Sequence, residues 1–152
     1  MPRNQYNEIN LNNTYHLFTY PNIMINEYDT KQIIDTIKNN SAGYLYIWEN
    51  KYLVLKTEFI KRYNIDTNLS LHGLLWISRT ILSFLHSIEH CKRIFTFDNK
   101  SATIKENYFP QIKNAVEEFY YLIAKCRELK VPMVYVIREL NHIIVWLYWI
   151  FL

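Results

Sequence analysis

Glycine is nearly absent from this chain, since only Gly43 and Gly73 occur in 152 residues. Loops that hold nucleotide phosphates need several glycines, because only a backbone without Cβ can approach the ligand closely enough. The sequence therefore excludes P-loop, dinucleotide-binding and kinase-type nucleotide sites.

Cysteine is equally scarce, with Cys91 and Cys126 as the two examples. Both fall at apolar positions of predicted helices, which favours buried free thiols over a disulfide. The first stretch, "MPRNQYNEINLNN", is polar and lacks the apolar centre of a secretory signal. We therefore expect an intracellular, cytoplasmic protein in a reducing setting.

Long apolar runs are also missing, apart from "IIVWLYWIFL" at residues 143–152. Its ten residues fall short of the roughly 20 that a helix needs to cross a bilayer. The sequence thus predicts no transmembrane span, and we interpret the run as a buried strand. A membrane-surface anchor and an oligomer interface are the alternatives.

The composition itself predicts a folded chain, because half of the residues are hydrophobic and 16% are aromatic. No repeat or linker divides the sequence, so we expect a polar lead at 1–13 and a single globular domain at 14–152. The net charge of +3 is too small to demand nucleic acid or an acidic partner, although it allows both.

The first half of the domain predicts two kinds of element. "TYHLFTY" favours a strand, and "YDTKQIIDTIKNN" favours a helix that Asp29 caps. The segment "GYLYIWENKYLVLKTEF" contains two β-rich runs around Glu49-Asn50-Lys51, which indicates a hairpin.

The second half predicts two long helices, at about 68–91 and 110–129, from apolar residues spaced by three and four. "RIFTF" and "PMVYVI" favour strands, so residues 93–137 have the pattern of a βαβ unit. We therefore expect an α/β or α+β single domain, with a mixed sheet that contains this unit and two long helices packed on it. A mostly α fold, in which 133–152 is a third long helix, is the alternative.

Residues 86–90 spell H-x-x-E-H, the pattern in which two histidines hold zinc and a glutamate activates water. His86 and His90 are thus weak candidate metal ligands, and Glu89 is a weak catalytic candidate. Arg79 and Arg93 lie about two helical turns to either side and would repel a dication. We expect no metal, and a metal-dependent hydrolase that uses His86 and His90 is an alternative.

The same helix carries a basic stripe that can meet phosphate or an acidic protein surface. Its members are the predicted binding residues Arg79, Ser83, His86, His90 and Arg93. This stripe makes an RNA-binding module one alternative function, beside an enzyme that uses Asp98 or the histidine pair.

Asp98 follows the predicted strand "RIFTF", at the place where parallel sheets carry catalytic groups. It is a weak catalytic candidate, because aspartates at loop starts are also ordinary turn residues.

"HGLLWISRTI", "RIFTFD" and "CRELKVPMVYV" together resemble the ribosomal-protein family that binds RNA kink-turns. The positions that correspond are Gly73, Arg79, Ile81, Asp98, Cys126, Val131 and Pro132. Leu75 and Trp76 stand where that family has the asparagine and glutamate that contact RNA. The resemblance therefore implies an α/β fold with a strand after Val131-Pro132, and it does not imply the RNA contact.

No complete catalytic constellation occurs in the sequence, and no cofactor is predicted. We therefore expect a small non-catalytic binding protein that acts through protein–protein contacts. The bias toward Asn, Ile, Lys and Tyr suits the low-GC genomes of many viruses and mobile elements, so the expected partner is a host protein. A homo-oligomer is a further partner that the sequence allows.

Overall fold

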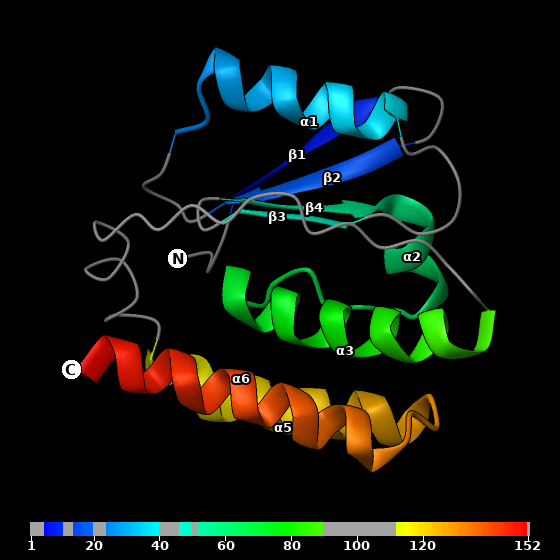
Figure 1. Ribbon diagram of the computed structural model, residues 1–152, viewed down its shortest axis with the longest axis vertical. Helices are drawn as coiled ribbons and strands as arrows, with labels where there is room; N and C mark the ends of the chain where they lie inside the picture. The colour runs from blue at the N-terminus through cyan, green and yellow to red at the C-terminus, as the bar shows by residue number, and fades with distance from the viewer. Residues whose placement is uncertain are drawn as a thin grey trace.

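The computed structural model describes residues 5–10, 14–19, 24–39, 46–49, 52–89 and 112–151. It contains strands β1 (Gln5–Asn10), β2 (Thr14–Thr19), β3 (Tyr46–Glu49) and β4 (Tyr52–Lys56). The helices are α1 (Glu27–Asn39), α2 (Thr57–Arg62), α3 (Leu71–Glu89), α5 (Ile112–Glu128) and α6 (Met133–Phe151). Helix α1 covers one face of the sheet, α3 lies on the other, and α5 and α6 pack beneath α3 (Figure 1).

The four strands form one sheet in the order β1-β2-β4-β3, and every neighbouring pair is antiparallel. The predicted strand at "TYHLFTY" and the two strands of the predicted hairpin are confirmed. Strand β1 falls within the predicted polar lead and pairs along its whole length with β2, from Gln5 with Thr19 to Asn10 with Thr14. The sheet thus begins before the domain boundary expected at residue 14.

The side chains of β4 point alternately to the two faces of the sheet, and each face has its own hydrophobic cluster. Tyr52 and Val54 pack in a cluster with Ile33 and Ile37 of α1, whereas Leu53 and Leu55 pack in the larger cluster with α3. Successive side chains of a strand point to opposite faces, so a strand covered on both sides is apolar throughout.

Helix α1 begins one turn earlier than the sequence indicates. The Asp29 backbone N–H donates to Asn26 Oδ1 at 2.8 Å, and the Asn26 N–H donates to Asp29 Oδ2 at 3.3 Å. Asn26 is therefore the N-cap residue. Asp29, the predicted cap, is the third residue of the helix, and its side chain bonds back to the N-cap backbone N–H as in a capping box. The prediction of the helix was right, and its assignment of the cap was wrong.

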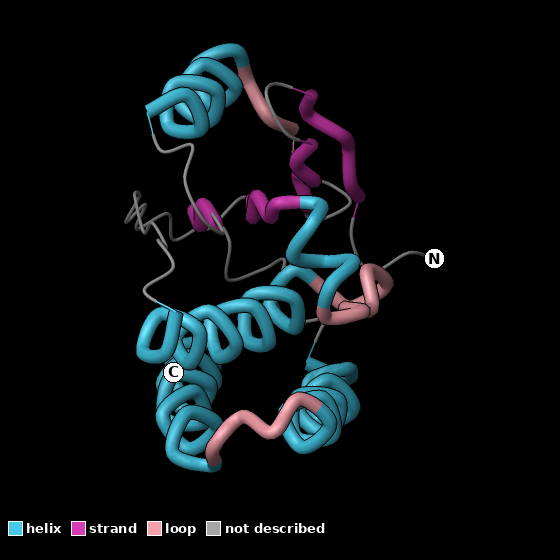
Figure 2. Tube along the Cα trace, turned by 90° about the vertical axis from the view of Figure 1, so that its right-hand side faces the viewer, coloured by secondary structure: helices cyan, strands magenta, loops and turns pink. Residues whose placement is uncertain are grey.

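Both predicted long helices are confirmed as α3 and α5, and α3 is the centre of the molecule. All residues from Leu71 to Ser78 are buried, because the sheet covers one side of α3 and the pair α5–α6 covers the other (Figure 2). Helix α3 packs on the sheet, whereas α5 packs on α3 (Figure 1).

The segment from Met133 to Phe151 is helix α6, so the predictions of a strand at "PMVYVI" and of a buried C-terminal strand are wrong. The βαβ unit at 93–137 is wrong as well, because its second strand is helical, and the strand implied after Val131-Pro132 is likewise absent. The predicted strand "RIFTF" lies outside the described residues. The fold is an α+β single domain with an antiparallel sheet, and the third long helix of the mostly α alternative is present in it.

The turn between α5 and α6 reverses the chain within four residues, 129–132. The Val131 N–H donates to the Cys126 carbonyl and the Lys130 N–H to that of Arg127, while Lys130 has a φ of 59°. These bonds form a Schellman ending, in which a left-handed residue terminates the helix. Helices α5 and α6 therefore lie antiparallel. None of the helices in the described ranges is long and apolar enough to cross a lipid bilayer.

Candidate functional site

A buried ion pair joins α3 to α6. Arg79 Nε donates to both carboxylate oxygens of Glu139, at 3.0 and 2.9 Å, and Nη2 also reaches Oε1. Glu139 is only 3% exposed and the Arg79 side chain 18%. The guanidinium that headed the predicted basic stripe is thus directed into the interface between two helices and neutralised there, rather than toward solvent.

Ser83 lines a hollow of about 180 Å³ between α3 and α6, with Arg79, Tyr135, Arg138 and His142 among its other walls. His86 is exposed further along α3, whereas His90 and Arg93 lie outside the described residues. The structure thus brings Arg79 and Ser83 together at one hollow and leaves His86 on the surface.

The metal and catalytic candidates stay predictions. In the described ranges no group of three His, Cys, Asp or Glu side chains could hold a metal ion. Glu89 belongs to α3, but its side chain is outside the described part, and so are His90 and Asp98.

Cys126 is a free thiol on α5 and is 1% exposed, as expected for a buried cysteine. Burial raises the pKa of Cys126 to about 12, and the nearby Glu139 carboxylate adds to the effect. A thiol that stays protonated is a poor nucleophile and a poor metal ligand, so Cys126 is a core residue.

Glu118 is a buried carboxylate, and no local pattern in the sequence indicates its burial. It is 2% exposed and accepts hydrogen bonds from the Ser70 backbone N–H at 2.9 Å and from Ser70 Oγ at 2.6 Å. Ser70 Oγ in turn accepts from the Gly73 N–H at 3.2 Å. Glu118 of α5 therefore completes the cap of α3, in the role that a glutamate at position 73 would have in a capping box.

A group of exposed apolar side chains lies on α5 and α6. Eight large hydrophobic side chains there are between 52% and 67% exposed. We call them the outer face; they are Val116, Tyr120, Met133, Val134, Ile137, Ile144, Val145 and Tyr148.

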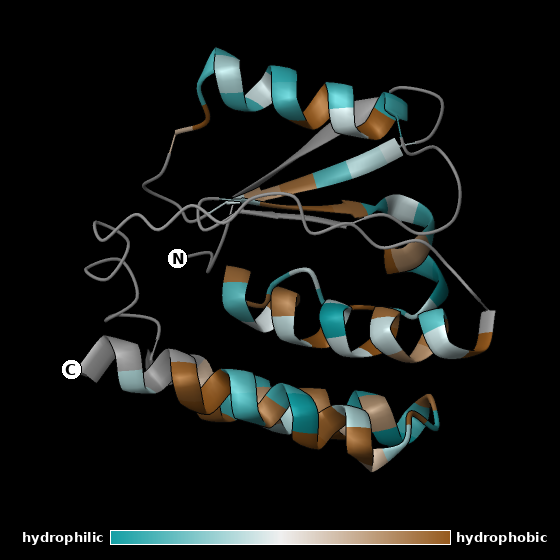
Figure 3. Ribbon diagram, in the orientation of Figure 1, coloured by the Kyte–Doolittle hydropathy of each residue, from teal (hydrophilic) through white to brown (hydrophobic). Residues whose placement is uncertain are grey.

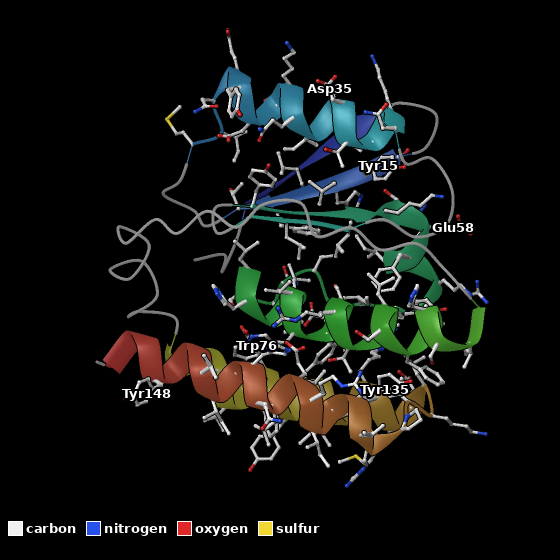
Figure 4. The ribbon with its side chains drawn as sticks, in the orientation of Figure 1. Tyr15, Asp35, Glu58, Trp76, Tyr135 and Tyr148 are labelled. Atoms are coloured by element: carbon white, nitrogen blue, oxygen red, sulfur yellow. The ribbon has the colours of Figure 1, made fainter. Side chains whose placement is uncertain are left out.

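The outer face lies opposite the contacts of α6 with the core. Val136, Glu139 and Ile143 of α6 are buried, and Val134, Ile137 and Ile144 lie around the helix from them. Tyr148 extends from α6 on the side away from α3 (Figure 4), and apolar residues recur along α6 (Figure 3). Helix α6 is apolar on its outer side as well as on its inner side. Packing against α3 and α5 buries only the inner side and leaves the outer apolar side in water. The continuous apolar run at 143–152 is the signal in the sequence for this surface, although its pattern predicts a strand rather than the helix that the structure has.

Comparisons with protein-family models, with curated proteins and with solved structures give no match for this chain.

Proposed function

We propose that this protein is a non-catalytic binding protein that acts through protein–protein contacts, and that its contact surface is the outer face of α5 and α6. The observation that carries the proposal is the grouping of eight exposed large apolar side chains on two adjacent helices. Single exposed apolar residues are ordinary, whereas monomers rarely leave an extended apolar patch in water.

The remaining exposed hydrophobic residues of the described chain provide a contrast. Met24 and Tyr28 are exposed four residues apart, just before and within α1, and Ile88 is exposed near the end of α3. Neither place has a group as large as the outer face, which stands apart from the rest of the described surface.

The nucleic-acid alternative has less support. A phosphate backbone is held by unpaired Arg and Lys side chains, and Arg79 is in a buried ion pair with Glu139. Of the two histidines that the zinc alternative requires, His86 lies in the described ranges, at the exposed end of α3, and His90 lies outside them. Helix-face recognition between proteins needs neither feature, since it relies on apolar anchors at three- and four-residue spacing.

The test is affinity capture from the native cell with a chain in which Ile137 and Ile144 are both replaced by glutamate. Both side chains are more than half exposed, so the fold should tolerate the charge, whereas an apolar interface should not. We expect the captured protein partner to be lost. Ile88→Glu is the matched control, because Ile88 is the same residue type at 55% exposure on another helix.

Two results would contradict the proposal. In one, the double variant captures the same proteins as the wild-type chain. In the other, Ile88→Glu is as damaging as the changes on α6. Circular dichroism of each variant verifies that the helices remain.

A further inference from the structure

The outer face of α6 has a spacing that is symmetric about Asn141. Ile137 and Val145 lie four residues before and after Asn141, and Val134 and Tyr148 lie seven before and after. All five side chains are exposed, and on a helix these spacings place them in one stripe. We call this set the α6 stripe.

A stripe of this kind is complementary to itself when a second helix runs antiparallel to it. Rotation about a two-fold axis at Asn141 sets Val134 against Tyr148 of the partner subunit and Ile137 against Val145 of the partner subunit. Closed dimers use such isologous contacts, in which one patch meets its own copy. The symmetry of the spacing is thus the property that a two-fold interface requires.

Asn141 is the one polar member of the α6 stripe and stands at its centre. A side-chain amide both donates and accepts hydrogen bonds, so Asn141 can pair with Asn141 of the partner subunit across the axis. A single asparagine in an apolar helix seam fixes register and oligomeric state in coiled coils. A lipid surface would instead leave this central amide without a partner.

The area is also sufficient. Half-exposed side chains of this size each leave on the order of 100 Å² in water, so the α6 stripe presents roughly 500 Å², and the outer face as a whole presents roughly 800 Å², which is the share of one partner in a standard interface. Helix α6 has 19 residues and is therefore about 28 Å long, enough for the stripe to span an interface of that size.

We propose that the occupant of the outer face is a second copy of this chain, with the two α6 helices packed antiparallel across a two-fold axis at Asn141. This inference rests on the proposed function, because it names the protein partner of the same surface. It adds a register, since Asn141 is the only member of the stripe that meets its own copy.

The first experiment is sedimentation velocity of the full chain at micromolar concentration. The wild-type chain should sediment as a dimer, and Asn141→Asp should weaken the dimer at least about tenfold at neutral pH, because it sets two carboxylates against each other. Asn68→Asp makes the same chemical change at an exposed residue between α2 and α3, and it should leave the dimer intact.

The second experiment tests the register directly. In a Cys91→Ser background, mild oxidation should link Asn141→Cys into a disulfide dimer, since the two thiols meet at the axis. Val134→Cys should link poorly, because its neighbour across the axis is Tyr148. Equal cross-linking at both positions would overturn the inference.

A monomeric wild-type chain would also overturn the inference. In that case the glutamate variants on α6 test the proposed function separately. If they still lose a cellular protein partner, the surface binds another protein, and the proposed function stands without the dimer. If the variants keep every cellular protein partner, both the dimer and the proposed function are contradicted. A monomer that binds anionic lipid vesicles through this face would assign the surface to a membrane and would likewise overturn the dimer.

Discussion

Replacing Gly73 with alanine is expected to destabilise the protein, although alanine is the better helix former. A Cβ placed on Gly73 would lie 2.2 Å from Glu118 Oε2 and 2.7 Å from Glu118 Cδ. Heavy atoms cannot approach so closely, so the buried carboxylate must move. The carboxylate would then lose its hydrogen bonds to the Ser70 N–H and hydroxyl, which hold the start of α3.

The size of the effect follows from these bonds. A hydrogen bond to a charged group contributes about 1.5–3 kcal/mol, so displacing Glu118 from two of them should cost about 3–6 kcal/mol. Replacing a helical glycine with alanine stabilises the helix by about 1 kcal/mol. The expected net loss for Gly73→Ala is thus about 2–5 kcal/mol of unfolding free energy.

The assay is urea unfolding followed by circular dichroism, in a double-mutant cycle with Glu118→Ala. Glu118→Ala removes the carboxylate and leaves Cβ of residue 118 at 3.3 Å from the new methyl group, a tight contact that a shift of a few tenths of an ångström relieves, so Gly73→Ala should there be nearly neutral or stabilising by up to about 1 kcal/mol. The loss of most of the destabilisation in the second background is the critical result. If Gly73→Ala stabilises the wild-type chain, or costs the same in both backgrounds, the cap formed by Glu118 does not operate as described.

Three further predictions concern the same fold. Arg79→Met should cost about 3–5 kcal/mol in urea unfolding, because it leaves the Glu139 charge buried without a partner. Arg79→Met combined with Glu139→Leu should be nearly neutral. A cost of under about 1 kcal/mol for Arg79→Met alone would contradict the buried pair. Asn26→Ala should cost about 1 kcal/mol through loss of the α1 cap, and no loss of thermal stability would argue against it. Burial, with a smaller contribution from Arg79, lowers the pKa of His72 well below 6.5. Below about pH 6.5 the unfolded chain therefore binds one more proton, on His72, than the folded chain. The free energy of unfolding should fall in this range by up to about 1.4 kcal/mol per pH unit. Unfolding titrations of His72→Phe should no longer show this pH dependence.

The elements that the sequence predicted correctly are those with an unambiguous period. Helices α3 and α5 have apolar residues spaced by three and four over many turns, β2 alternates polar and apolar residues from Thr14 to Leu17, and β4 is a short apolar run. Helix α6 was misassigned because it is apolar on two faces. It is buried on one side by α3 and α5 and exposed on the other, so its sequence contains two β-branched and aromatic runs, 133–137 and 143–151. The period of the apolar residues alone does not distinguish a helix from a strand in such short runs.

The charged residues show why the candidate site was harder to predict than the fold. Arg79 lies among the polar positions of α3 in the sequence, but its partner Glu139 is 60 residues away on a helix whose sequence is in part typical of a strand. Glu118 is likewise an ordinary surface residue in the sequence until α5 brings it to Ser70. Side-chain pairs between distant elements depend on the packing angle of the helices, which local spacing does not encode.

Photo-crosslinking in the native cell tests the central claim most directly, with a benzophenone amino acid placed at one tyrosine at a time. Tyr148 of the outer face and Tyr28 of α1 are 65% and 67% exposed, so solvent access does not distinguish them. We expect the probe at Tyr148 to give a discrete cross-linked protein band and the probe at Tyr28 to give none. Equal cross-linking at the two positions, or none at Tyr148, would contradict the assignment of the outer face as the binding surface.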